Sequence, residues 1–244
     1  MQPFHRHKTG AAALFLLMLS PGAHAGLDFD FEIQPGATQE DFESVAEDVA
    51  ALLNSKTLTP AEPMGLTGFG IGVYASYLET ESAGAWQRVT GEDIDEIGMV
   101  GVVAQKGLPL GIDVGASYAW VPESDVEMLG AEIRYALLEG GVATPAIGLR
   151  GSYSKLDGVD EVDFDSYGIE IAISKGFGPL TPYAGVGQVW SELKPDSAFG
   201  LDKEKIDDTR FFVGLRLSAL IGLTPEYERI GDRDVFNLRF GFAF

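Results

Sequence analysis

The chain has 244 residues, with 37 Asp and Glu against 17 Lys and Arg, a formal net charge of −20 and no cysteine. Binding to nucleic-acid phosphates needs a basic face, so this balance argues against a nucleic-acid partner. The three histidines, His5, His7 and His24, all precede residue 26. Histidine triads, thiol nucleophiles and ordinary zinc sites are therefore excluded from the rest of the chain.

Residues 1–25 have the pattern of an export signal. Arg6 and Lys8 precede an apolar run from Ala11 to Leu19, and a Pro-Gly pair and small residues follow it. The run is too short to cross a bilayer as a helix, so we expect a cleaved secretory signal. Without it the chain carries 15 basic and 37 acidic residues, a formal charge of −22. No later run of 18 apolar residues occurs, so a membrane-embedded form would have to use strands.

Residues 26–65 are predicted to form an acidic helical segment with a connector. Thr38 resembles a helix N-cap, and apolar residues recur at helical spacing over residues 38–54. Pro60 and Pro63 then indicate a stiff connector. If residues 66–244 form a membrane barrel, as their own pattern predicts, the helix could plug it or lie at its periplasmic rim. We favour the rim, because a ten-stranded lumen that holds ion pairs leaves little room.

From Leu66 onward the apolar residues recur with period two, which indicates strands with one apolar face. Tight turns alternate with longer polar connections, and ten is an even number, as a closed single-chain bacterial barrel requires. Residues 66–244 therefore predict an all-β, antiparallel, transmembrane up-and-down barrel. The expected strands are residues 66–78, 96–106, 109–121, 126–138, 143–155, 163–174, 179–191, 208–221, 223–230 and 234–244.

The strand face opposite the apolar one carries five acidic and five basic residues. Such a balance suits a lumen filled with paired charges, because a buried unpaired ion is costly. A soluble barrel would instead turn its apolar face inward; the export signal and the aromatic residues near strand ends favour a membrane. The predicted lumen network is Asp113, Glu132, Arg134, Arg150, Glu170, Arg210, Arg216, Glu226, Glu228 and Arg239.

Two of these carboxylates suggest a catalytic alternative. Glu226 and Glu228 share a face about 7 Å apart along their strand, and paired carboxylates can perform acid/base chemistry. Neutralisation by the interior arginines is the simpler interpretation. We therefore expect no catalytic residues and no enzyme.

The chain ends in FNLRFGFAF, in which one parity is uniformly apolar. This strand resembles the β-signal of Gram-negative outer-membrane proteins, and residues 66–244 resemble the small barrels grouped with OmpA-type, OmpW-type and opacity-type proteins. Those barrels usually have eight strands, so the count of ten is a departure, or two strands are divided too finely. The resemblance implies a place in the outer membrane, contact with its lipids and lipopolysaccharide, and recognition by the barrel assembly machinery. The implied assembly signal is Phe236, Leu238, Phe240, Phe242 and Phe244.

One acidic stretch invites a metal interpretation. It contains Asp157, Asp160, Glu161, Asp163 and Asp165, but its spacing matches no EF-hand loop. We expect no cofactor beyond loosely held divalent cations. Two functions stay open: a structural or interaction protein with a charge-filled lumen and acidic outer loops, or a porin-like channel for small solutes or hydrophobic molecules with the helix as its plug.

Overall fold

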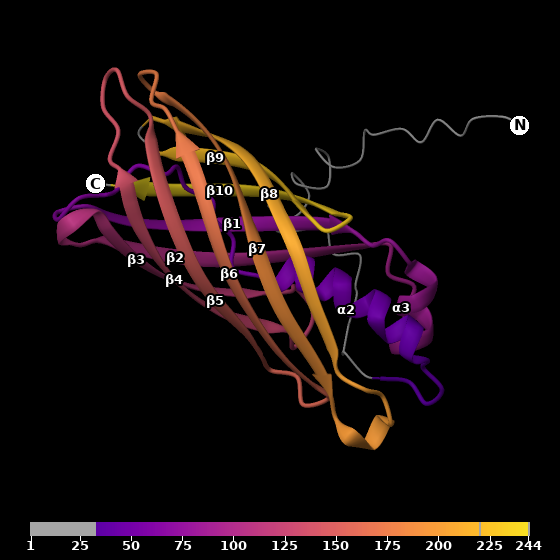
Figure 1. Cartoon of the computed structure of the whole chain (residues 1–244). Coiled ribbons are helices and arrows are strands. Elements are labelled where there is room, and N and C mark those ends of the chain that lie inside the picture. Colours follow the sequence, from indigo (N-terminus) through magenta and orange to yellow (C-terminus); the bar gives the residue numbers. More distant parts are fainter. Residues whose placement is uncertain (1–32, 220, 244) are drawn as a thin grey trace, which may run out of the picture.

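The computed structural model describes residues 33–219 and 221–243. Each strand pairs antiparallel with its neighbours in the chain, and β1 pairs with β10 from Gly70↔Ala243 to Leu78↔Val235, which closes the ring. The fold is therefore a closed up-and-down barrel (Figure 1). The predicted ten strands and the seam between the first and the last are confirmed. The strands are β1 (Phe69–Glu79), β2 (Glu96–Gly107), β3 (Ile112–Trp120), β4 (Glu127–Leu138), β5 (Ala146–Asp157), β6 (Val162–Ser174), β7 (Leu180–Pro195), β8 (Glu204–Ser218), β9 (Gly222–Ile230) and β10 (Arg233–Ala243).

The strands β7 and β8 are longer at one end than the sequence suggested. Their ladder continues to Leu193↔Glu204, and only residues 196–203, which include the short 3-10 helix η2 (Ser197–Phe199), connect them. Polar residues such as Glu192 and Lys203 made this stretch resemble a loop. Here they pair across the hairpin instead, with Nζ of Lys203 3.0 Å from a carboxylate oxygen of Glu192.

The outer surface of the barrel is apolar. Along β1, β6 and β8 the large apolar side chains of one parity are exposed, as a soluble barrel would not allow. They include Ile71, Val73, Ile169, Ile171, Ile173, Phe211 and Val213. Trp120 at the end of β3 is an exposed aromatic residue, and so are Tyr167 and Trp190, which face each other across β6 and β7. Tyr77, near the end of β1, is only 3% exposed. Within the described ranges, no helix is long and apolar enough to cross a membrane.

The two ends of the barrel differ. We call the end with connections 80–95, 121–126, 158–161, 196–203 and 231–232 the loop end, and the end that holds η1 (Pro109–Gly111) and the C-terminal end of β10 the turn end. The connection at 80–95 contains a helix, α3 (Ala83–Thr90), which the sequence analysis did not predict. Ser82 caps its start and Gly91 ends it in the left-handed region, with φ 86°.

The predicted N-terminal helix is confirmed as α2 (Gln39–Leu53), with Thr38 as its N-cap. Its predicted rim position is wrong. Figure 1 shows α2 beside α3 at the loop end, and residues 54–64 continue through the barrel until the backbone N–H of Met64 reaches the carboxylate of Asp113. The lumen has room because the strand charges alone do not fill it. We call residues 39–64 the plug.

The direction of the plug is also informative. Ile33 is buried, and the backbone N–H of Gln34 donates to the carbonyl of Val89, the residue before the last one of α3. The chain therefore enters at the loop end, descends through the lumen and leaves at the turn end, where β1 begins. The predicted signal, residues 1–25, lies outside the described residues.

Candidate functional site

The middle of the lumen is a buried network of arginines and carboxylates from β4 to β9. Arg150 lies 2.6 Å from Glu132 and 3.0 Å from Glu170. Arg210 contacts Glu170 and lies 2.7 Å from Glu228. All five side chains are at most 5% exposed. Neighbouring strands place these groups on one inner surface, for example in the register pair Arg150↔Glu170.

The plug completes this network with a cation of its own. Nζ of Lys56 lies 3.1 Å from a carboxylate oxygen of Glu228 and donates to the carbonyl of Ala51 at 2.8 Å. The lysine side chain is 1% exposed. A buried ammonium is tolerated only when it is paired and hydrogen bonded, so these contacts fix both the height and the orientation of the plug.

Backbone groups of the plug bind the same network. The carbonyl of Ser55 accepts hydrogen bonds from Arg150 and Arg210, each at 3.1 Å. The hydroxyl of Thr57 donates to Glu170 at 2.9 Å. Irregular backbone inside a barrel needs such partners, and the wall supplies them.

Glu226, one of the two carboxylates considered for acid/base chemistry, is held in the same way. It accepts from the hydroxyl of Tyr183 at 2.7 Å and from the backbone N–H of Leu58 at 3.2 Å, and it lies 3.9 Å from Arg210. Its Oε1 atom is buried and has no hydrogen-bond partner. Both carboxylates, Glu226 and Glu228, therefore contact the plug.

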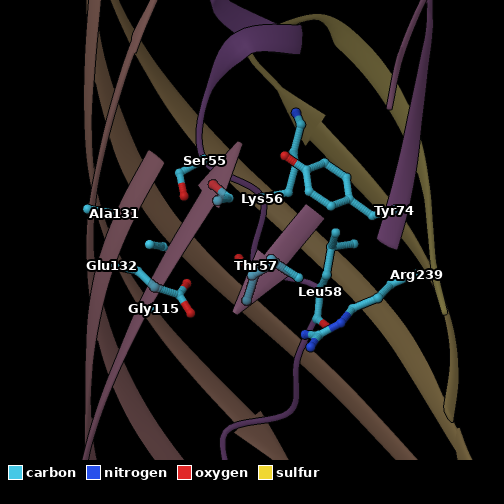
Figure 2. Close-up of a pocket in the computed structure, with 12 residues that line it drawn as sticks. Ser55, Lys56, Thr57, Leu58, Tyr74, Gly115, Ala131, Glu132 and Arg239 are labelled. Carbon is cyan, nitrogen blue, oxygen red and sulfur yellow. The ribbon is translucent and has the colours of Figure 1, made fainter. Parts of the chain in front are cut away.

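Little space remains around the plug at this height. Figure 2 shows residues 55–58 passing down the interior, with Tyr74 and Arg239 on one side and Glu132 on the other. Cavities of about 10 and 20 Å³ flank this stretch. A single water needs roughly 10–15 Å³, so these cavities offer no continuous path for solute.

The turn-end part of the network is looser. Arg134 lies 2.9 Å from Asp113 and donates to the hydroxyl of Thr59 at 2.7 Å. Arg216 pairs with Glu62 of the plug at 3.1 Å, and both side chains are about 30% exposed. All ten residues predicted for the lumen network thus have inward-facing positions in the barrel, and Lys56 and Glu62 of the plug join them.

The loop end is closed by contacts of α2 with α3 and with β10. The carboxylate of Asp48, which is 0% exposed, accepts from Nε1 of Trp86 and from Nε of Arg233, each at 2.9 Å. Asp41 lies 2.5 Å from Arg88, and the hydrogen bond from this guanidinium lowers the pKa of Asp41 below its usual value. Apolar side chains of α2 fill the space between these pairs, including Phe42, Val45, Leu52 and Leu53.

Two of the acidic residues considered for loosely held cations have other partners. Asp163 pairs with Lys194 at 3.3 Å, and the hydroxyl of Tyr153 donates to Asp165. Across the part of the chain that the structure describes, no three residues of His, Cys, Asp and Glu gather in a way that could hold a metal. The structure gives no support to a specific calcium site in 157–165.

The predicted assembly signal has the expected alternation. Phe236 and Phe242 are exposed on the outer surface, whereas Asn237 and Arg239 are buried on the inner one. Phe244 lies outside the described residues. The alternation places the apolar parity of β10 where it would meet lipid.

The sequence analysis missed Lys56, Ser55 and Thr57 as parts of the network. One signal was present: Lys56 is the single basic residue among the nine acidic ones of residues 26–65. Lys56 follows the helix by three residues and pairs with Glu228 of the wall.

Comparisons with known proteins found similar chains only among solved structures. No family model and no curated protein matches the chain. Among solved structures, the N-terminal β-barrel domain of Pseudomonas aeruginosa OprF is similar at 13% identity over 74% of this chain and 99% of its own, with a TM-score of 0.37. The KdgM porin is similar at 10% identity over 71% of this chain and 99% of its own, with a TM-score of 0.37. Yersinia pestis Ail, solved with sucrose octasulfate, is similar at 14% identity over 72% of this chain and 97% of its own, with a TM-score of 0.28. These are outer-membrane β-barrels, and they place the chain in no subfamily.

Proposed function

We propose that the protein is an integral outer-membrane barrel of structural or interaction type whose lumen is blocked by its own N-terminal plug. The observation that carries this proposal is the burial of Lys56 in the network of Glu228 and Arg210. The cavities beside residues 55–58 are about the size of single waters, which supports a lumen that is closed to solutes at this height.

The surface of the barrel supports a membrane location. An apolar outer face on a closed barrel has no backbone edge to solvate and matches hydrocarbon. Lipids and lipopolysaccharide are then its surroundings, and β10 is the strand that the assembly machinery would read. Heat-modifiable gel mobility of the detergent-extracted protein tests this claim; a protein that stays soluble and folded without detergent would contradict it.

Orientation follows from the two ends. Outer-membrane barrels have short periplasmic turns and longer extracellular loops, so the loop end would face outside. Ile33 and Gln34, which lie beside α3, would then also be at the outer end of the lumen. A tag inserted before Ile33 should be accessible to antibody on intact cells, whereas a tag after Gly140, at the turn end, should not.

Single-channel recording in planar bilayers tests the blocked lumen. The purified protein should give no stable open steps, and a variant that lacks residues 26–62 should conduct. Stable steps from the intact protein would refute the proposal.

A second candidate function is a gated channel for small solutes or hydrophobic molecules. One observation favours it: a cavity of about 420 Å³ opens beside residues 58–64 at the turn end. The recording above separates the two functions, because a gated channel would show rare full openings that disappear when the plug is cross-linked to the wall.

A further inference from the structure

The cavity at the turn end has an unusual distribution of charge. Its wall carries three arginines from three strands, Arg134 on β4, Arg216 on β8 and Arg239 on β10, and one carboxylate, Glu62 of the plug. The lumen as a whole is balanced, with Lys56 and five strand arginines against Glu62 and five strand carboxylates. The positive excess is therefore local to this cavity.

Arg239 is the source of the excess. Its guanidinium donates to the side-chain oxygen of Gln105 at 2.9 Å and to the carbonyl of Leu58 at 3.4 Å, which are both neutral acceptors. Among the described residues, no carboxylate lies within 4.0 Å of it. The residue is 7% exposed. A buried guanidinium without an anion is costly, so this position favours an anion supplied from outside.

The two other arginines keep spare donors. The Nε atoms of Arg134 and Arg216 are buried and have no hydrogen-bond partner. Arg216 donates from Nη2 to Glu62 at 3.1 Å, and the side chain of Glu62 is 30% exposed and therefore reachable by solvent. The carboxylate of Glu62 therefore occupies a position beside Arg216 that an external anion could share or take.

We propose that this cavity binds a small oxyanion, a phosphate or a carboxylate, between Arg216 and Arg239. Guanidinium groups present paired donors that match the oxygens of such anions. A volume of about 420 Å³ holds a small oxyanion with several waters. The cavity faces the aqueous turn end rather than the apolar outer surface, so a free solute fits it better than a lipid headgroup. The site exists whether or not the lumen conducts.

Calorimetric titration of the full-length protein in detergent with inorganic phosphate tests the proposal. Sodium chloride keeps the ionic strength constant, so that general screening is not counted as binding. We expect saturable binding, weakened roughly tenfold or more by Arg239→Gln, because a hydrogen-bonded charge is lost. Citrate in place of phosphate distinguishes the two oxyanion classes; saturation by either one supports the site.

Glu62→Gln gives a result that a purely structural role would not produce. Removing the internal carboxylate frees Arg216, so phosphate should bind more tightly than to the parent protein. Arg229→Gln is the control, since Arg229 is exposed, pairs with Asp234 at 3.2 Å and lies at the loop end; it should leave the affinity unchanged. If Arg239→Gln does not fold, Arg216→Gln takes its place with the same expected loss.

Three results would overturn the proposal. They are the absence of saturable heat with both anions, an affinity that Arg239→Gln or Arg216→Gln leaves unchanged, and equal weakening by Arg229→Gln. The last would mean that only the net charge of the protein matters.

Discussion

Lys56→Met should loosen the plug without removing it. The substitution deletes the pair with Glu228 at 3.1 Å and the hydrogen bond to Ala51 at 2.8 Å, while methionine still fills the space of the lysine stem. Breaking a buried pair costs about 3–5 kcal/mol. Glu228 keeps Arg210 at 2.7 Å and Asn237 at 3.2 Å, so we expect about 3 kcal/mol, the lower end of that range. The population with the plug withdrawn should rise about a hundredfold.

The absence of cysteine from the chain makes this population measurable. Val45 is 0% exposed on α2, and cysteine is close to valine in size, so Val45→Cys provides a reporter inside the closed mouth. Its labelling by a maleimide should follow the population of the withdrawn state when opening and closing are fast. The rate should rise about a hundredfold when Lys56→Met is added.

A surface lysine is the control. Lys205 is 69% exposed and pairs with Glu192 at 3.7 Å, so Lys205→Met should leave the labelling rate unchanged. Adding Glu228→Gln to Lys56→Met should lower the labelling rate part of the way back, because it removes the carboxylate charge that Lys56→Met leaves with fewer partners. Equal rates for the parent and Lys56→Met would refute the idea that this pair holds the plug.

Two further predictions concern the wall and the mouth. A Cβ at Gly214 would lie 2.3 Å from the ring of Tyr183, so Gly214→Ala should destabilise the barrel by about 1–3 kcal/mol and lower the temperature at which its gel mobility changes. Gly151→Ala, whose Cβ would have its nearest neighbour at 3.6 Å, should not. The hydrogen bond from Arg88 holds the pKa of Asp41 below its usual value, so the contribution of this pair to stability is present at neutral pH and is lost as the pH falls through the lowered pKa. The temperature at which the detergent-solubilised protein unfolds should therefore fall at low pH, and Asp41→Asn should reduce that fall; a fall of equal size in Asp41→Asn would contradict this cause.

The barrel was predictable because its pattern has a strong physical cause. A strand between lipid and lumen must alternate strictly, so period two persists from Leu66 to the end of the chain, and the inward charges have to balance. The same argument located the ten lumen charges and the seam between β1 and β10. Hairpin stretches that extend beyond the apolar belt do not need this alternation, because neither of their faces contacts lipid. The outer ends of β7 and β8 therefore resembled loops in the sequence.

The plug position was not predictable by the same reasoning. An amphipathic helix shows in its sequence that it buries one face, but not which surface covers that face. Residues 54–59 have no periodicity at all, since their order comes from backbone contacts with Arg150, Arg210 and Glu226. The helix α3 was missed because eight residues give little periodicity, although Ser82 and Gly91 mark its ends.

The continuity of the plug with β1 constrains the order of biogenesis. The plug leaves the lumen at Met64, and the seam strand starts at Phe69. Once β10 has paired with β1, residues 33–53 could reach the loop end only by being drawn through a ring that is nearly full. The plug and β1 must therefore form a hairpin while the sheet is still open. The pairing of β10 with β1 then closes the ring around that hairpin. A bulky folded domain fused ahead of Ile33 should accordingly stall the barrel before ring closure.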